Sequence, residues 1–66
     1  MRIQLNGEFL EVPDGSSVAD LLVRLDLAGR RLAVELNEEI VPRSAHASTF
    51  LHADDRIEVV HAIGGG

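Results

Sequence analysis

The sequence contains no cysteine, which excludes disulfide bonds and cysteine-ligated zinc as sources of stability. It has no apolar run near the roughly 20 residues that span a bilayer, and no signal-peptide pattern at its start. We therefore expect one soluble, cytoplasmic domain. A chain of 66 residues buries only about 60% of its unfolded surface, so this domain needs an efficient core. A hydrophobic content of 45% supplies enough residues for one.

Lysine is also absent: all 6 basic residues are arginine, against 11 acidic residues and a net charge of −5. An acidic chain is poorly suited to bind nucleic acid or an anionic membrane, and its charge favours a basic partner surface. A genome whose base composition favours arginine codons explains the missing lysines without any functional role.

The first twelve residues predict a β-hairpin. Residues 1–5 alternate between apolar and polar side chains, Asn6-Gly7 signals a two-residue turn, and residues 8–12 return as a second strand. Folding about this turn brings five apolar side chains to the core face: Met1, Ile3, Leu5, Leu10 and Val12. It places Phe9 on the outer face, together with a predicted cross-strand ion pair between Arg2 and Glu11.

Residues 17–28 predict an amphipathic helix. Ser17 is the expected N-cap, and Asp20 completes a short capping box. Apolar residues recur at helical spacing: Val18, Leu21, Leu22 and Leu25. Gly29 is the expected C-terminal stop.

Three shorter strands are expected in the second half of the chain: residues 32–37, residues 40–41 and residues 56–63. Segment 43–51 predicts an irregular or one-turn helical connection, anchored in the core by Phe50 and Leu51. Asp54-Asp55 predicts a turn before the last strand.

This order of elements predicts an α+β fold, in which one helix packs across one face of a mixed sheet of four to five strands. The first and last strands are the most apolar, so we place them side by side and parallel at the centre of the sheet. On the face opposite the helix, strand alternation directs Phe9, Val60 and Ala62 outward, and these residues form a candidate docking face for a partner.

Catalytic constellations are poorly represented. Ser16 and Ser17 stand where a helix begins, so capping explains them better than nucleophilic catalysis. The spacing of His46, His52 and His61 matches no metal-ligand pattern. So small a core also leaves no room for a ligand pocket of ordinary size. We therefore expect no catalytic residue, no metal and no bound cofactor.

The sequence closes on Gly64, Gly65 and Gly66, directly after the last strand. A frayed tail is one explanation, since chain ends are often disordered. The other is entry into a partner's active site, because three extended residues reach roughly 10 Å and have no side chains to obstruct a channel. Glycine also has no stereocentre to lose when its carboxylate is activated as an acyl-adenylate. Without lysine, no ε-amine of the chain can intercept that activated group, which is a second explanation for the absence.

Segment 32–66, LAVELNEEIVPRSAHASTFLHADDRIEVVHAIGGG, resembles the C-terminal half of the thiamin-biosynthesis sulfur carriers of the ThiS family. The likeness rests on IVPR at 40–43, the acidic turn before RIE and the glycine end. LNGE and the helix start DGSSVADLL extend it over nearly the whole chain. One departure is Asp54, where the family usually has glycine, and this puts the geometry of the turn in question.

The resemblance implies a ubiquitin-like β-grasp domain over residues 1–63 and a flexible tail over residues 64–66. It also implies a ThiF-like adenylating enzyme that uses ATP and Mg²⁺ to convert the Gly66 carboxylate to an acyl-adenylate. A persulfide sulfur donor then displaces AMP and leaves a thiocarboxylate, which thiazole synthase consumes in thiamin biosynthesis. The chain is then a carrier and not an enzyme, and Gly64 and Gly65 give clearance within the partner's active site.

Three other functions stay open. The small subunit of molybdopterin synthase has the same fold and thiocarboxylate but a different recipient, although the short chain and IVPR favour the thiamin carrier. A ubiquitin-like modifier predicts isopeptide-linked adducts in cells. A plain β-grasp interaction domain predicts that deletion of Gly65 and Gly66 has no effect.

Overall fold

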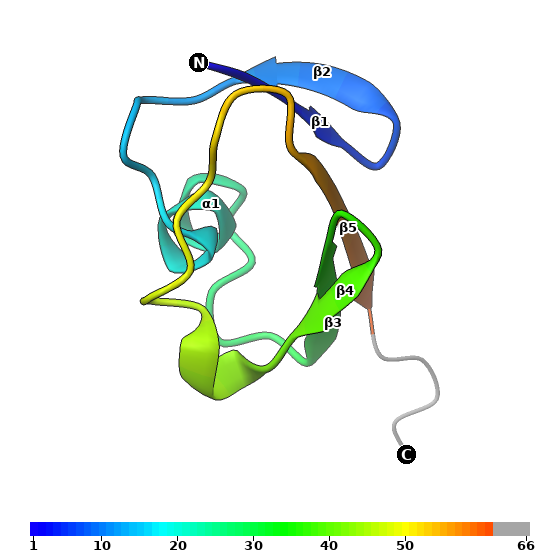
Figure 1. Cartoon of the computed structure of the whole chain (residues 1–66). Helices are drawn as coiled ribbons and strands as arrows, with labels where there is room; N and C mark the ends of the chain where they lie inside the picture. The colour runs from blue at the N-terminus through cyan, green and yellow to red at the C-terminus, as the bar shows by residue number, and fades with distance from the viewer. Residues whose placement is uncertain (62–66) are drawn as a thin grey trace.

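A five-stranded sheet with one helix on one face makes up residues 1–61, the part of the chain that the computed structural model describes (Figure 1). The elements are β1 (Arg2–Leu5), β2 (Glu8–Glu11), α1 (Val18–Arg24), β3 (Leu32–Leu36), β4 (Glu39–Val41), the 3₁₀ helix η1 (Arg43–Ala45) and β5 (Arg56–His61). The strand order is β2-β1-β5-β3-β4. β1 and β5 run parallel and the other neighbours antiparallel, so the predicted α+β architecture and its parallel pair are confirmed.

Both hairpins turn on the same short pattern, Leu-Asn-x-Glu, at residues 5–8 and 36–39. Asn6 and Gly7 have φ angles of 50° and 85°, and Asn37 and Glu38 have φ angles of 50° and 72°. Positive φ at both central residues gives the backbone twist that joins two antiparallel strands most directly. The first hairpin has the predicted register, and the second repeats its turn without glycine.

The two turn asparagines also hold β5 from both sides. The Oδ1 atom of Asn6 accepts a hydrogen bond from the Val59 N–H at 2.9 Å, and its Nδ2 donates to the Val59 carbonyl at 3.4 Å. On the other side, Asn37 Oδ1 accepts from the Arg56 N–H at 2.9 Å, and Asn37 Nδ2 donates to the Asp55 carboxylate at 3.0 Å. The side chain of Asn6 therefore continues the attachment of β5 beyond the end of β1.

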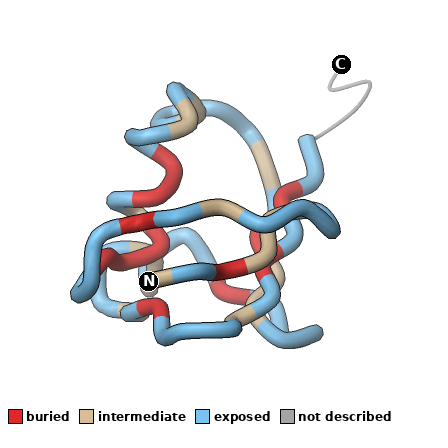
Figure 2. The backbone as a smooth tube through the Cα atoms, turned by 90° about the horizontal axis from the view of Figure 1, so that it is seen from above, coloured by how far each residue is buried: buried red, intermediate tan, exposed pale blue. Residues whose placement is uncertain are grey.

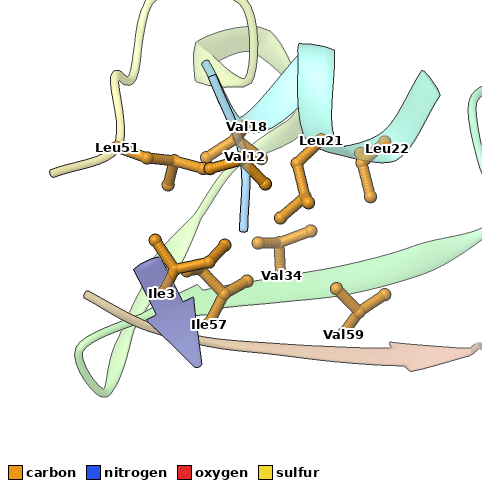
Figure 3. Packing of buried hydrophobic residues seen from close by; sticks show 9 residues of the cluster. All are labelled: Ile3, Val12, Val18, Leu21, Leu22, Val34, Leu51, Ile57 and Val59. Atoms are coloured by element: carbon orange, nitrogen blue, oxygen red, sulfur yellow. The ribbon is translucent and has the colours of Figure 1, made fainter. Parts of the chain in front are cut away.

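The hydrophobic core lies between α1 and the sheet (Figure 3). Buried residues recur at intervals along the chain between exposed ones (Figure 2). α1 contributes Val18, Leu21 and Leu22, as its apolar spacing predicts. The remaining buried members come from strands and loops: Ile3, Val12, Val34, Leu51, Ile57 and Val59. The core face predicted for the first hairpin is confirmed, since Ile3 and Val12 are buried and Met1, Leu5 and Leu10 pack against them.

α1 begins as predicted. Ser17 is the N-cap, its hydroxyl accepts from the Asp20 N–H at 3.0 Å, and the Asp20 carboxylate accepts from the Ser17 N–H at 3.0 Å. This reciprocal pair satisfies the backbone N–H groups of Ser17 and Asp20 at the start of a short helix.

The predicted C-terminal end of the helix is wrong. α1 ends at Arg24, not at residue 28. The N–H groups of Asp26 and Leu27 donate to carbonyls three and five residues before them, at 3.0 and 2.8 Å, and Asp26 has a φ of 60°. This is a Schellman motif, with aspartate in the left-handed position that glycine usually occupies. Gly29 therefore follows the helix within a separate turn and does not stop it.

The predicted ion pair between Arg2 and Glu11 is not formed, although the two residues face each other across the hairpin. The Arg2 guanidinium lies over the Phe9 ring, 4.3 Å from its centroid. The Glu11 carboxylate instead lies 3.5 Å from the Met1 ammonium. Both exposed side chains thus have another partner within reach.

Phe50 is not a core anchor, whereas Leu51 is: their exposed fractions are 54% and 3%. The Leu51 N–H donates to the Ser16 carbonyl at 2.8 Å, and the Val18 N–H donates to the Thr49 carbonyl at 2.9 Å. These bonds lay the segment beside the start of α1, with Phe50 paired to Ser17 in an isolated β-bridge. Neighbouring side chains of an extended segment point to opposite sides, so only one of the two can face the core.

Candidate functional site

β5 carries the chain toward its terminal glycines. β1 pairs only with Arg56 and Ile57 of this strand, whereas β3 pairs with it as far as His61. Among the described residues, Val60 and His61 therefore have a strand neighbour on one side only. The other predicted site residues lie outside the described residues: Ala62, Gly64, Gly65 and Gly66.

The sheet face opposite α1 carries the two described members of the predicted docking face, Phe9 and Val60. Their exposed fractions are 63% and 54%, and that of Ile40 on β4 is 70%. Ile40 belongs to the same outer face, because it lies opposite Glu35, which lies opposite Glu58. Ile40 is not among the residues predicted from the sequence. Its outward direction could have been inferred from the sequence, because a two-residue turn at Asn37-Glu38 places Ile40 opposite the outward-facing Glu35.

Phe9 and Val60 lie at different ends of this face. Phe9 shares a row across the sheet with Arg56, and Val60 is four residues further along β5. At the rise of a β-strand, four residues span about 13 Å. Val60 instead lies directly opposite Ala33. The apolar surface nearest to the end of β5 therefore consists of Val60 and Ala33, with Ile40 on the neighbouring strand.

Two carboxylates lie opposite each other on this face. Glu35 and Glu58 are direct partners on β3 and β5, an arrangement that is unfavourable for like charges. In residues 1–61, neither forms an ion pair with a basic group. This part of the face is therefore acidic as well as apolar, and it suits the basic partner surface that the net charge predicts.

Three of the residues weighed for catalysis or metal binding have structural partners: Ser16, Ser17 and His46. Ser17 is the helix cap, and the Ser16 hydroxyl donates to the Pro13 carbonyl at 2.7 Å. His46 Nε2 lies 3.1 Å from the Val41 carbonyl oxygen. No three histidine or carboxylate side chains within the described part of the chain are grouped so that they could hold a metal ion. In the same part of the chain, no helix has the length and apolar character to cross a membrane.

A mixed five-stranded sheet that wraps one helix, with its parallel pair inside the sheet, defines a β-grasp protein of the ubiquitin-like class. The chain belongs to the ThiS family, whose model matches residues 3–66. A crystal structure of the thiamine biosynthesis protein ThiS from Geobacter metallireducens has a TM-score of 0.87 and 32% identity, and each chain covers 100% of the other. The sulfur carrier protein ThiS of Bacillus subtilis (strain 168) is 35% identical over 65 residues, which are 97% of this chain and 98% of that one.

Some longer proteins contain a stretch similar to this chain. The thiazole synthase of Magnetococcus marinus is 44% identical over 66 residues, which are 100% of this chain but 20% of that protein. The chain therefore spans one fifth of the length of this curated relative.

Proposed function

We propose that the chain is a sulfur carrier of thiamin biosynthesis, and that its Gly66 carboxylate is converted to a thiocarboxylate. The observation that carries this proposal is the match to the ThiS family over residues 3–66, which includes all three terminal glycines. The two related proteins named sulfur carrier protein ThiS, from Bacillus subtilis and Escherichia coli, are of the same length class, since the chain covers 98% and 100% of them.

The chemistry begins with activation of the carboxylate, because a free carboxylate has no good leaving group. A ThiF-like adenylating enzyme uses ATP and Mg²⁺ to form the Gly66 acyl-adenylate and release pyrophosphate. The terminal sulfur of a persulfide donor then attacks the acyl carbon and AMP leaves. The product is an acyl disulfide that joins Gly66 to the donor. A thiol reductant cleaves its S–S bond, which leaves the thiocarboxylate on Gly66 and a mixed disulfide between the donor and the reductant. Thiazole synthase is the recipient, and we place this cycle in the cytoplasm.

The chain contributes presentation and not catalysis. Gly64 and Gly65 have no side chains, so they can pass through a narrow channel that other residues would block. Gly66 has no stereocentre, so activation cannot racemise it. Residues 1–63 form the domain that presents the tail of residues 64–66. The partners dock on the outer sheet face, through Val60 near the end of β5, through Ala62, which follows β5 in the sequence, and through Phe9 at the far end.

The docking face can be tested one end at a time, because its two described residues are well separated. Val60→Asp places a negative charge at the apolar end of the face. Phe9→Asp places a negative charge at the other end, in the same row of the sheet as Arg56. We expect Val60→Asp to raise the KM of the adenylating enzyme for the carrier without lowering kcat. Unchanged adenylation kinetics in both variants would place the docking face elsewhere.

The decisive experiment is the intact mass of the chain after incubation with a ThiF-like enzyme, ATP, Mg²⁺, a persulfide donor and a thiol reductant. Oxidation of Met1 adds nearly the same mass as replacement of oxygen by sulfur, so fragmentation must place the change on Gly66. An alkylating reagent should trap the new sulfur there, and a chain without Gly65 and Gly66 is the control. An unmodified terminus, with the enzyme shown to be active on another carrier, would contradict the proposed function.

A further inference from the structure

A shallow groove of about 450 Å³ lies beside the end of β5. Its lining comes from the loop before β3, from β3 itself, from η1 and from β5: Arg31, Leu32, Ala33, Arg43, Val60 and His61. It is therefore immediately beside the last described residue, from which the chain continues into residues 62–66.

The groove is a basic site on an acidic chain. Two guanidinium groups line it and no carboxylate does, although the chain has 11 acidic and only 6 basic residues. Within residues 1–61, neither Arg31 nor Arg43 forms an ion pair. Arg43 Nη2 instead donates to the Arg30 carbonyl at 3.3 Å. This bond keeps the Arg43 guanidinium near the chain that carries Arg31, despite their like charges.

The position of the groove restricts what it can bind. Five extended residues span at most about 17 Å, so the reacting carboxylate of Gly66 can lie that far from His61. With the tail extended into a channel, a nucleotide at the reacting carboxylate lies up to about 17 Å from the groove. The surface that meets the groove is instead the protein surface around the mouth of the channel that the glycines enter.

We propose that this groove binds a carboxylate-bearing segment of thiazole synthase at the mouth of that channel; the inference rests on the proposed function. Guanidinium groups recognise carboxylates through paired, charge-assisted hydrogen bonds. Leu32, Ala33 and Val60 supply apolar contact between the two arginines and the end of β5. Thiazole synthase is the proposed occupant because the thiazole synthases of Magnetococcus marinus and Paramagnetospirillum magneticum each contain a stretch similar to the whole of this chain, which covers 20% of their length.

The test is binding of the full chain to the thiazole synthase encoded in the same genome, measured by calorimetry over a series of salt concentrations. Arg31→Gln and Arg43→Gln should each weaken binding about tenfold and reduce its salt dependence. Arg24→Gln is the matched control, because it removes the same charge from exposed α1 surface and should bind as the original chain does. Arg43→Lys should recover only part of the affinity, since it restores the charge without the fork of donors.

A second readout separates this inference from the proposed function. Single-turnover sulfur transfer from the thiocarboxylate, at saturating carrier, should be unchanged in Arg31→Gln and Arg43→Gln, because the groove does not touch the reacting atoms. Unfolding in urea checks that both variants remain folded. If both variants bound thiazole synthase as tightly as the original chain does, the proposed role of the groove would be wrong, while the carrier function would be unaffected. Weakened binding to the adenylating enzyme alone would also contradict the proposed role of the groove. A chain that forms no thiocarboxylate would instead overturn the proposed function.

Discussion

At the scale of single residues, Asp54 stands where the resemblance to the ThiS family predicts glycine, and its backbone has a positive φ. Asp54 has a φ of 70°, in the left-handed region where glycine is most easily accommodated. Its N–H donates to the Arg2 carbonyl at 2.8 Å, and the following Asp55 N–H donates to the His52 carbonyl at 3.1 Å. The turn therefore has the glycine-like conformation without glycine. Aspartate is among the residues that tolerate the left-handed region.

Glu38 is the least favourable of these positions, because glutamate lacks the tolerance of Asn and Asp for left-handed backbone. Its φ is 72°. We expect Glu38→Gly to raise the free energy of unfolding by about 1 kcal/mol, since it removes a strain of ~1–2 kcal/mol and adds a smaller entropic cost. Urea denaturation measures the change. Glu39→Gly is the control and should destabilise β4. A loss of stability in Glu38→Gly would mean that the ion pair of Glu38 with Arg56, at 3.8 Å, outweighs the strain.

The Met1 ammonium predicts a dependence of stability on pH. A hydrogen bond to the Asp14 carboxylate, at 3.1 Å, is the main cause that raises the pKa of this group, with Glu11 adding a smaller contribution. A group with a raised folded-state pKa stabilises the fold fully below its unfolded-state pKa. This stabilisation is lost as the pH rises through the folded-state pKa.

Urea denaturation from neutral to mildly alkaline pH should therefore show a falling free energy of unfolding. Asp14→Asn removes the main cause and should flatten this slope, whereas Asp26→Asn changes the same charge away from Met1 and should not. Equal slopes for the original chain and Asp14→Asn would contradict the assignment.

At the level of whole elements, the side chain of Asn6 helps to hold strand β5 in the sheet. Asn6→Ala should lower the free energy of unfolding by about 2 kcal/mol, because it removes the side-chain bonds to Val59 and leaves alanine at φ 50°. Asn6→Asp is the matched variant, since it keeps the Oδ1 acceptor and a side chain tolerant of this conformation. It should lose less than half as much. Urea denaturation and amide exchange at Val59 measure both. Equal losses would assign the effect to the donor Nδ2 alone.

Elements with a strong local pattern could be predicted from the sequence, and their ends could not. The Asn6-Gly7 turn set the first register, and the Ser17–Asp20 pair located the start of α1. The end of α1 was missed because Asp26 takes the conformation expected of Gly29. Which residue takes the left-handed conformation that ends the helix depends on how the following chain packs Leu27 against the core. That packing is a tertiary property.

The site was predicted in part for a similar reason. Alternation along β5 is a local pattern, so the outward direction of Val60 could be predicted. The proximity of Arg31 and Arg43 could not, because Arg31 lies in the loop before the β3–β4 hairpin and Arg43 lies in η1 after it. Only the return of β3 beside β5 brings both of them to the end of the last strand.

For the molecule as a whole, one small core holds the helix against the sheet and hence fixes the direction of β5. Natural domains are stable by about 0.05–0.15 kcal/mol per residue, which gives roughly 3–10 kcal/mol for a chain of this size. No disulfide is available to add to this, because the sequence has no cysteine. The loss of one well-packed side chain is therefore comparable with the total stability.

Leu21→Ala tests this dependence. Leu21 is 1% exposed and packs between α1 and the sheet (Figure 3), and truncation of such a leucine costs about 3–5 kcal/mol. We expect this variant to be largely unfolded at 37 °C, with lost ellipticity and loss of sulfur acceptance on Gly66. Val23→Ala, on the same helix at a position that is 66% exposed, should remain folded and accept sulfur normally. A folded Leu21→Ala variant with an unchanged urea midpoint would mean that the layers are held mainly by the strand and asparagine hydrogen bonds, and that the helix contributes little to presenting the tail.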